Sequence, residues 1–261
     1  MIALYLNING NHRFIVNKLF PIYEDLGVDI LWYSDEEEIH LMRKSSEIND
    51  KVMLDLWSNL KEGKTERYYG NLLKEIYESY GVSKFSFDPI VAVSPNGADP
   101  HHECDNTKIT RGKSIVLDIG GVYNYYCSDM TRTVFFGEAP SKKHEEIYNI
   151  VKEANLKAIG KVKEGVKFSD IDKAARSYIE EAGYGEYFTH RTGHSIGIED
   201  HDFGDVSSVN HEEVKAGMIF SIEPGIYLKD DIGVRIEDLV LVTKDGCEVL
   251  NKVSKDITII K

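Results

Sequence analysis

The stretch Ser114–Val134, with the sequence SIVLDIGGVYNYYCSDMTRTV, places two acids beside runs of β-branched residues. Such runs are typical of buried strands, where a charge without a partner is costly. Gly120-Gly121 and Asn124 lie between Asp118 and Asp129 and predict a hairpin turn. We therefore expect the two carboxylates to face one another across antiparallel strands and to need a cation.

Three later segments combine an acid or a histidine with β-branched or glycine-rich neighbours. They are Thr192–Ile198 around His194, Phe220–Gly225 around Glu223, and Gly233–Leu239 around Glu237. The polar run Lys229–Gly233 predicts a turn between strands at 220–222 and 234–236. Glu223 and Glu237 are therefore expected to repeat the arrangement of the first two acids.

These five residues together suit a two-metal hydrolytic centre. Four converging carboxylates at ~4 Å repel one another by roughly 4 kcal/mol per pair, even at an effective dielectric of about 20. Two divalent cations cancel four negative charges, and we expect them as cofactors. The donors are mostly oxygen with one imidazole and no thiolate. This set favours Mn²⁺ first, with Co²⁺, Zn²⁺ or Fe²⁺ as alternatives, and argues against a closed structural zinc site.

The chain also contains an internal repeat. Lys163-Glu-Gly165 repeats Lys61-Glu-Gly63, and Gly183 repeats Gly81, in each case 102 positions later. A helical stripe precedes each of these glycine stops. Thr65 is expected to cap the first such helix, and Ser169 with Asp172 the second, over residues 169–182. The pattern predicts a two-fold repeat of helix, helix and antiparallel strands, with the site between the halves.

Composition limits the remaining classes of function. The 261 residues and 42% hydrophobic content fit one large domain, or one domain plus a fragment. The net charge of −13 argues against non-specific nucleic-acid binding. No apolar run approaches the ~18 residues that span a bilayer, and no secretory signal is evident. The three cysteines are odd in number and far apart, as expected for reduced thiols. These features predict a cytoplasmic protein without membrane partners.

Residues 36 to about 245 resemble the catalytic domain of the methionine-aminopeptidase-like "pita-bread" metallopeptidases. Within that family they are most similar to the prolidase and aminopeptidase P branch, because Arg235-Ile-Glu-Asp238 is the prolidase-like form of the last motif. The resemblance implies an α+β pita-bread fold (creatinase/aminopeptidase-like) with an internal two-fold repeat and a curved antiparallel sheet covered by helices. It makes residues 36–261 the catalytic domain and 1–35 the remnant of an N-terminal creatinase-like domain.

The resemblance also implies the role of each of the five residues. Asp118 and Asp129 would chelate, His194 would bind one metal, and Glu223 and Glu237 would complete the shells, with Asp129 and Glu237 bridging. A bridging hydroxide would be the nucleophile. Glu223 would carry a proton from the nucleophile to the leaving nitrogen.

Five further residues match the same branch. His101 resembles the family's substrate-proximal histidine, although His102 is an alternative for that role. His201, beside Asp202, resembles the residue that stabilises the tetrahedral intermediate, and a solvated surface histidine is the alternative. The others are His190, which resembles a pocket histidine near the proline subsite or serves only a structural role, and Arg235 and Tyr227, which resemble a network that orients the metal ligands.

The resemblance implies a dinuclear metallopeptidase that hydrolyses Xaa-Pro bonds at the N-terminus of dipeptides or short peptides. Its partners would be short proline-containing peptides and, through the family's N-terminal domain, a second copy of the chain in a homodimer. Two alternatives remain open, a methionine aminopeptidase-like activity and a non-catalytic peptide-binding module of the same fold.

Overall fold

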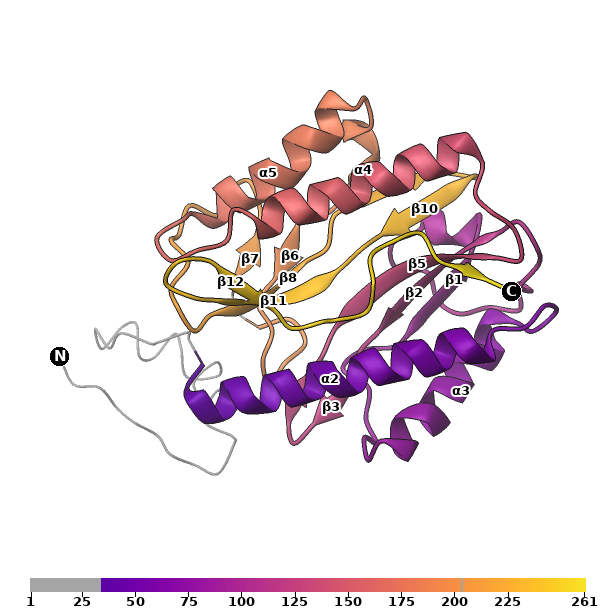
Figure 1. The fold of residues 1–261 in the computed structure, drawn as a ribbon, viewed down its shortest axis with the longest axis horizontal. Coiled ribbons are helices and arrows are strands. Elements are labelled where there is room, and N and C mark those ends of the chain that lie inside the picture. The colour runs from indigo at the N-terminus through magenta and orange to yellow at the C-terminus, as the bar shows by residue number, and fades with distance from the viewer. Residues whose placement is uncertain (1–33, 203) are drawn as a thin grey trace.

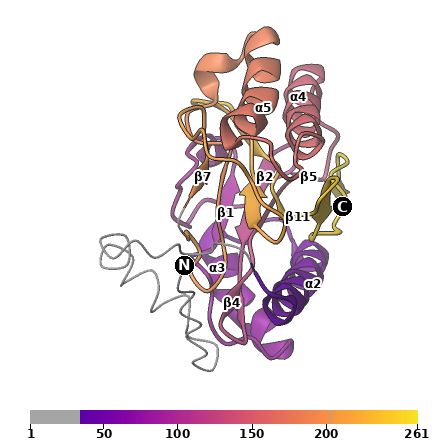
Figure 2. The same cartoon turned by 90° about the vertical axis from the view of Figure 1, so that its left-hand side faces the viewer.

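The computed structural model describes residues 34–202 and 204–261 (Figure 1). In the views of Figures 1 and 2, helices α4 and α5 lie at one end of the molecule and α2 and α3 at the other, with strands between the two pairs. The structure has the pita-bread architecture that the sequence predicted, with mixed helices and sheets. Residues 1–35, expected to be the remnant of another domain, lie almost wholly outside the described residues.

Capping residues set the starts of three of the four α-helices in the described residues. Asp35 accepts from the backbone N–H of Glu38, whose side chain accepts from the N–H of Asp35 in return, a capping box. Thr65 caps α3 as predicted, and Ser141 caps α4. The helices are α2 (Glu36–Asn59), α3 (Glu66–Ser79), α4 (Lys142–Ile159) and α5 (Phe168–Glu181).

Thirteen strands and two short 3-10 helices make up the remaining regular structure of the described residues. The strands are β1 (Ile90–Val93), β2 (Ser114–Ile119), β3 (Val122–Tyr123), β4 (Tyr126–Cys127), β5 (Met130–Phe136), β6 (Gly193–His194), β7 (Asp205–Val206), β8 (Ile219–Ile222), β9 (Gly225–Leu228), β10 (Ile232–Arg235), β11 (Asp238–Val242), β12 (Cys247–Val249) and β13 (Ile259–Ile260). The 3-10 helices are η1 (Asn96–Ala98) and η2 (Gly185–Tyr187).

The two largest sheets of the described residues, here called the half-sheets, meet at a seam, and β3–β4, β6–β7 and β9–β10 form three further two-stranded sheets. One half-sheet has the order β1-β2-β5-β13 and is antiparallel except for β13, which runs parallel to β5; the other has the order β12-β11-β8. At the seam the N–H of Glu237 donates to the carbonyl of Thr131 at 3.1 Å. The Thr133 hydroxyl exchanges hydrogen bonds with the backbone of Arg235, accepting from its N–H and donating to its carbonyl. Backbone and side chains therefore join the halves across the middle of the molecule.

The internal repeat is visible in matched elements. Helices α3 and α5 have 14 residues each, and both their ends are offset by 102 positions. The glycines of the repeated motif all adopt left-handed backbone angles, with φ between +79° and +84°: Gly63, Gly81, Gly165 and Gly183. Asn49 of α2 donates to the carbonyl of Ile119, and Asn155 of α4 donates to that of Ile222. Each half therefore fixes its ligand-bearing strand to its long helix in the same way.

Two expectations about local structure were wrong. Helix α5 begins at Phe168 after Lys167, so Ser169 and Asp172 lie inside it and do not cap it. The strand Phe220–Ile222 pairs with β11 and not with residues 234–236. The turn at Lys229–Gly233 instead joins β9 to β10, because the chain turns at Pro224 and starts a separate strand at Gly225.

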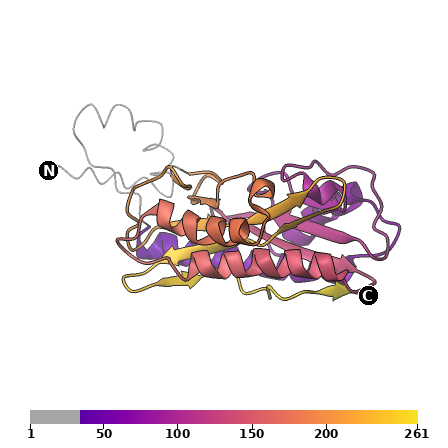
Figure 3. The ribbon, with the colours of Figure 1, turned by 90° about the horizontal axis from the view of Figure 1, so that it is seen from above.

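The apolar core follows the two halves. One buried cluster packs α4 and α5 on the C-terminal strands, and a second packs α2 and α3 on β1, β2 and β5. Seen from above, α4 and the C-terminal segment lie on the same side of the molecule (Figure 3). The three cysteines carry free thiols. Among the described residues no helix is long and apolar enough to cross a membrane.

Candidate active site

The five predicted residues converge where the half-sheets meet, with Asp118 in β2, Asp129 before β5, His194 in β6, Glu223 after β8 and Glu237 between β10 and β11. Nε2 of His194 lies 3.4 Å from Oδ2 of Asp129 and 3.6 Å from Oε1 of Glu223. Ligand atoms of Asp129, His194 and Glu237 all lie within 4.8 Å of one another. All but Glu223 are buried, and the Glu223 side chain is only 15% exposed.

Asp129 does not face Asp118 directly. The residue opposite Asp118 across the β2–β5 ladder is Thr131. The short hairpin β3–β4 lies between the two acids in the chain, and Asp129 comes one residue before β5 begins. The predicted hairpin therefore exists, but the acid lies two positions before the expected register.

The backbone holds the imidazole of His194 in one orientation. Its Nδ1 lies 3.3 Å from the carbonyl oxygen of Ser195, which can only accept a hydrogen bond. Nδ1 is therefore protonated, and the lone pair of Nε2 faces the acids. Burial lowers the pKa of His194, which favours this neutral form.

Three buried carboxylate oxygens of the predicted ligands lack a hydrogen-bond partner. They are Oδ1 of Asp118, Oδ1 of Asp129 and Oε1 of Glu237. Burial, and then repulsion from neighbouring acids, raises the pKa of Asp129 and of Glu237 well above the usual range. Unpartnered buried oxygens are rare in proteins because each costs free energy. Oxygens and a neutral imidazole around one point are the donors that divalent cations prefer, so these residues fit such a group.

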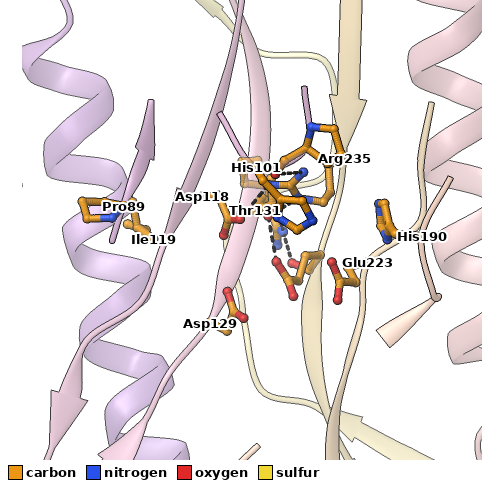
Figure 4. A network of polar contacts seen from close by, with 12 residues as sticks. Pro89, His101, Asp118, Ile119, Asp129, Thr131, His190, Glu223 and Arg235 are labelled. Atoms are coloured by element: carbon orange, nitrogen blue, oxygen red, sulfur yellow. Dashed lines mark hydrogen bonds and ion pairs between the residues drawn. The ribbon is translucent and has the colours of Figure 1, made fainter. Parts of the chain in front are cut away.

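Arg235 connects Asp118 to neighbouring polar groups of the site (Figure 4). Its Nη2 lies 2.6 Å from Oδ2 of Asp118, and its Nε donates to the Thr131 hydroxyl at 3.0 Å. Nη1 donates to the Tyr227 hydroxyl at 2.9 Å and to the carbonyl of Pro100 at 3.4 Å. Although burial disfavours the charge, Tyr227, Asp118 and the nearby glutamates raise the pKa of Arg235 well above its usual value, so the guanidinium stays charged.

His190 extends this network on the far side of Tyr227. Nδ1 of His190 lies 2.6 Å from the carbonyl oxygen of Arg191 and so carries the proton. Nε2 therefore accepts from the Tyr227 hydroxyl at 2.8 Å, and that hydroxyl accepts in turn from Arg235. Burial lowers the pKa of His190 and raises that of Tyr227 to about 12. The predicted trio is thus one chain of hydrogen bonds. Figure 4 shows His190 beside Glu223.

His201 lies at the mouth of the site, against His194. The two rings are 4.1 Å apart at their centroids, and the His201 side chain is 60% exposed. Arg191 donates to Nδ1 at 3.2 Å, which leaves the proton on Nε2. Burial, His194 and Arg191 lower the pKa of His201 to about 4, so the ring is neutral. On the other side of His201 in the chain, Oδ2 of Asp200 lies 3.6 Å from Nε2 of the ring.

The adjacent histidines His101 and His102 point in different directions. Nε2 of His102 lies 2.7 Å from Oε2 of the fully buried Glu66. His101 is exposed and lies near Arg235 and Asp118 (Figure 4). Of the two, only His101 is free to meet a molecule in the site. Glu66, His102 and Asp105 form a second acidic cluster, but backbone N–H groups of Val93 and Asp105 already saturate Glu66.

Comparison with known proteins places this arrangement in a family. Residues 40–244 match the sequence model of metallopeptidase family M24. The chain belongs to metallopeptidase family M24. An uncharacterized peptidase of Staphylococcus aureus (strain MW2) is 47% identical over 220 residues, which cover 84% of this chain and 62% of the relative.

Solved structures agree with the M24 assignment. An Xaa-Pro dipeptidase from Bacillus anthracis superposes with a TM-score of 0.85 at 38% identity, covering 87% of this chain and 64% of the other. A prolidase from Thermococcus sibiricus gives a TM-score of 0.87 at 40% identity, covering 92% and 65%. The M24 chain therefore spans slightly less than two thirds of the length of these relatives.

Sequence reasoning missed three residues of this M24 site. Thr131 donates to Oε2 of Glu237 at 2.7 Å, and its position two after Asp129 on a strand signalled that it shares a face with the acids. Arg191 meets His201 only through tertiary folding. Asp200 has a buried oxygen without a partner, and burial, with the nearby acids, raises its pKa to about 6. Its place beside His201 was the available signal.

Proposed function

We propose that this M24 chain is a dinuclear metallopeptidase that hydrolyses Xaa-Pro bonds at the N-terminus of dipeptides or short peptides. The observation that carries the proposal is the set of three unpartnered buried carboxylate oxygens, of which those of Asp129 and Glu237 belong to side chains that cluster with His194. A non-catalytic binding module would have no reason to keep this costly arrangement. The Xaa-Pro dipeptidase and the prolidase named among the similar structures support the choice of substrate.

The proposed ligands are Asp118, Asp129, His194, Glu223 and Glu237, with Asp129 and Glu237 each reaching both cations. Bound divalent cations would lower the pKa of water and polarise the substrate carbonyl. The donor chemistry favours Mn²⁺ and also accepts Co²⁺, Zn²⁺ or Fe²⁺. In the free protein repulsion between these acids raises the pKa of Asp129, and a cation would remove that repulsion.

Glu223 is the proposed proton carrier. Its backbone N–H is held by the carbonyl of Thr192, and the Ser221 hydroxyl donates to its Oε1 at 3.3 Å. Burial raises the pKa of Glu223. A carboxyl group whose pKa lies closer to the pH of the reaction can both accept and donate a proton efficiently. It is therefore suited to receive a proton from the attacking water and to deliver it to the leaving nitrogen.

His201 and His101 are proposed to act on the substrate from the open side. The neutral ring of His201 carries its proton on Nε2 and can donate it to a carbonyl oxygen as negative charge develops there. His101 is exposed beside Arg235 and can contact the peptide. His190, with Tyr227 and Arg235 behind it, would form the wall against which a proline ring lies.

Proline suits such a site because the scissile imide nitrogen has no N–H for a peptidase to hold. Recognition must then come from the carbonyl, the ring and the free amino terminus. We propose residues 36–261 as the catalytic domain and residues 1–35 as the last part of an N-terminal domain. A homodimer built through that domain and a cytoplasmic location complete the proposal.

The test compares peptides that differ at the second residue. Purified chain with Mn²⁺ or Co²⁺ is incubated with Ala-Pro, Ala-Pro-Ala and Met-Ala-Ser, and the released amino acid is measured. We expect hydrolysis of the proline peptides and little of Met-Ala-Ser. Preference for Met-Ala-Ser would replace the proposal with a methionine aminopeptidase. Metal binding without hydrolysis of any peptide would favour the binding module.

A further inference from the structure

A buried ion pair lies directly behind the candidate metal centre. Arg132 and Asp238 are 1% and 0% exposed, and Nη2 of the arginine lies 2.7 Å from Oδ1 of the aspartate. Each follows a residue of the site, since Thr131 and Glu237 precede them in the chain. Side chains alternate faces along a strand, so Arg132, with Asp238 beside it, lies on the opposite face of β5 from Thr131.

Arg132 also binds the backbone on both sides of the seam. Its Nη1 donates to the carbonyl of Thr131 at 2.9 Å and to the carbonyl of Glu237 at 2.5 Å. Two other hydrogen bonds already link these residues. The N–H of Glu237 donates to the carbonyl of Thr131, and the Thr131 hydroxyl donates to the Glu237 carboxylate. A single guanidinium thus holds two strands, one from each half-sheet, that share no regular ladder.

The C-terminal segment closes this arrangement from outside. It runs between α2 and α4 across the strands (Figure 1). The carbonyl of Val253 accepts from Nε and Nη2 of Arg132, and Lys255 lies 2.9 Å from Oδ2 of Asp238. Asn251 donates to the carbonyl of Asp129 at 3.4 Å and accepts from the N–H of Leu239. Segment 251–255 therefore contacts the backbone of Asp129 directly and that of Glu237 through Arg132.

We propose that Arg132 and Asp238 are positioning residues that fix the register of the two half-sheets and thereby the spacing of Asp129 and Glu237. This inference rests on the proposed metal centre and assigns to it a support on the far face of the sheet. One half supplies Asp118 and Asp129, and the other supplies Glu223 and Glu237. A small slip at the seam would therefore change the distances between ligands of different halves.

A buried ion pair is a weak means of adding stability, because desolvation offsets the attraction between its charges. Its geometric effect is more specific, since the planar guanidinium donates in fixed directions to three carbonyls and a carboxylate at once. Lysine would keep the charge but cannot reproduce this fork. The two roles can therefore be separated by one conservative substitution.

The experiment measures Mn²⁺ affinity by titration calorimetry on the metal-stripped full chain and on two variants, Arg132→Lys and Asp238→Asn. Ile171→Ala serves as a control, because Ile171 is buried on α5 away from the seam. Circular dichroism and thermal melting show whether each variant folds. We expect Arg132→Lys to weaken Mn²⁺ binding by about 10- to 100-fold, the usual range for residues that support metal ligands. Ile171→Ala should melt earlier and bind Mn²⁺ like the wild type.

Asp238→Asn keeps an acceptor for Arg132 but removes its charge, and we expect a loss of roughly tenfold, the lower end of that range. This variant decides the matter if Arg132→Lys does not fold. Wild-type affinity in the folded variants would overturn the positioning role and leave the proposed function intact. A loss of affinity in Ile171→Ala equal to that in Arg132→Lys would also overturn it, because general destabilisation would then explain both. A wild-type chain that binds no Mn²⁺ would instead overturn the proposed function and, with it, this inference.

Discussion

The Thr131 hydroxyl donates a 2.7 Å hydrogen bond to Oε2 of Glu237 and accepts one from Nε of Arg235 at 3.0 Å. This small side chain therefore links the last carboxylate of the site to the only guanidinium that binds Asp118 among the described residues. Because it occupies one oxygen of Glu237, only Oε1 is left without a partner. The threonine thus determines which oxygen of that carboxylate faces an incoming cation.

Replacing Thr131 by valine should weaken metal binding. Valine keeps the shape but removes the hydroxyl, so Glu237 can rotate and Nε of Arg235 loses its acceptor. We expect affinity for Mn²⁺ to fall by roughly 10-fold, at the lower end of the range for residues that orient ligands. Titration calorimetry measures this, with Thr131→Ser as the matched control that restores the hydroxyl. An equal loss of Mn²⁺ affinity in Thr131→Val and Thr131→Ser would show that the hydroxyl does not support metal binding.

Asp129→Ala and Glu237→Ala should each abolish the binding of both metal ions, because each carboxylate is proposed as a ligand of both ions. His194→Ala should mainly weaken one of the two sites, since its Nε2 offers a single lone pair. Elemental analysis and calorimetry of the purified variants provide the stoichiometry. Two ions bound at full affinity in Asp129→Ala would refute the bridging assignment.

Asp129→Asn should stabilise the metal-free protein increasingly as the pH rises. The folded pKa of Asp129 is raised above its unfolded value of about 4, so its contribution is fully present below that pH and is lost as the pH rises toward the folded pKa. Asparagine has no proton to lose. The difference in unfolding free energy should grow by up to about 1.4 kcal/mol per pH unit. Denaturant melts between pH 5 and 8 test this, and a constant difference would contradict it.

His201→Ala should fold, keep its metals and lose on the order of 10²–10³ in kcat, the range for one removed donor to a developing oxyanion. KM should change less, because the hydrogen bond strengthens only in the transition state. Steady-state kinetics with Ala-Pro provides both constants. A large rise in KM at constant kcat would make His201 a residue that binds the ground state.

Local signals in the sequence predicted the helices and the composition of the site well. Thr65 caps its helix as expected, because N-cap chemistry depends only on neighbouring residues. Strand pairing was less predictable. Residues 220–222 could pair with either of two apolar strands of similar pattern, and only the tertiary fold selects β11.

Roles that depend on contacts across the seam were the hardest to predict. Thr131 and Arg132 look like ordinary strand residues, and their function follows from meeting Glu237 and Asp238 more than a hundred positions away. His101 and His102 are neighbours of the same type, so only the position of Glu66 distinguishes them. The sequence therefore indicates which chemical groups are present, and the packing decides what each one touches.

The most direct test of the account is a Mn²⁺ titration of the metal-stripped chain while hydrolysis of Ala-Pro is followed. We predict no hydrolysis without metal, and a rate that rises as the cation is added and reaches its maximum when two equivalents are bound. Full hydrolysis in the presence of excess chelator would contradict the account. So would a chain that binds two equivalents of Mn²⁺ and cleaves neither Ala-Pro nor Ala-Pro-Ala.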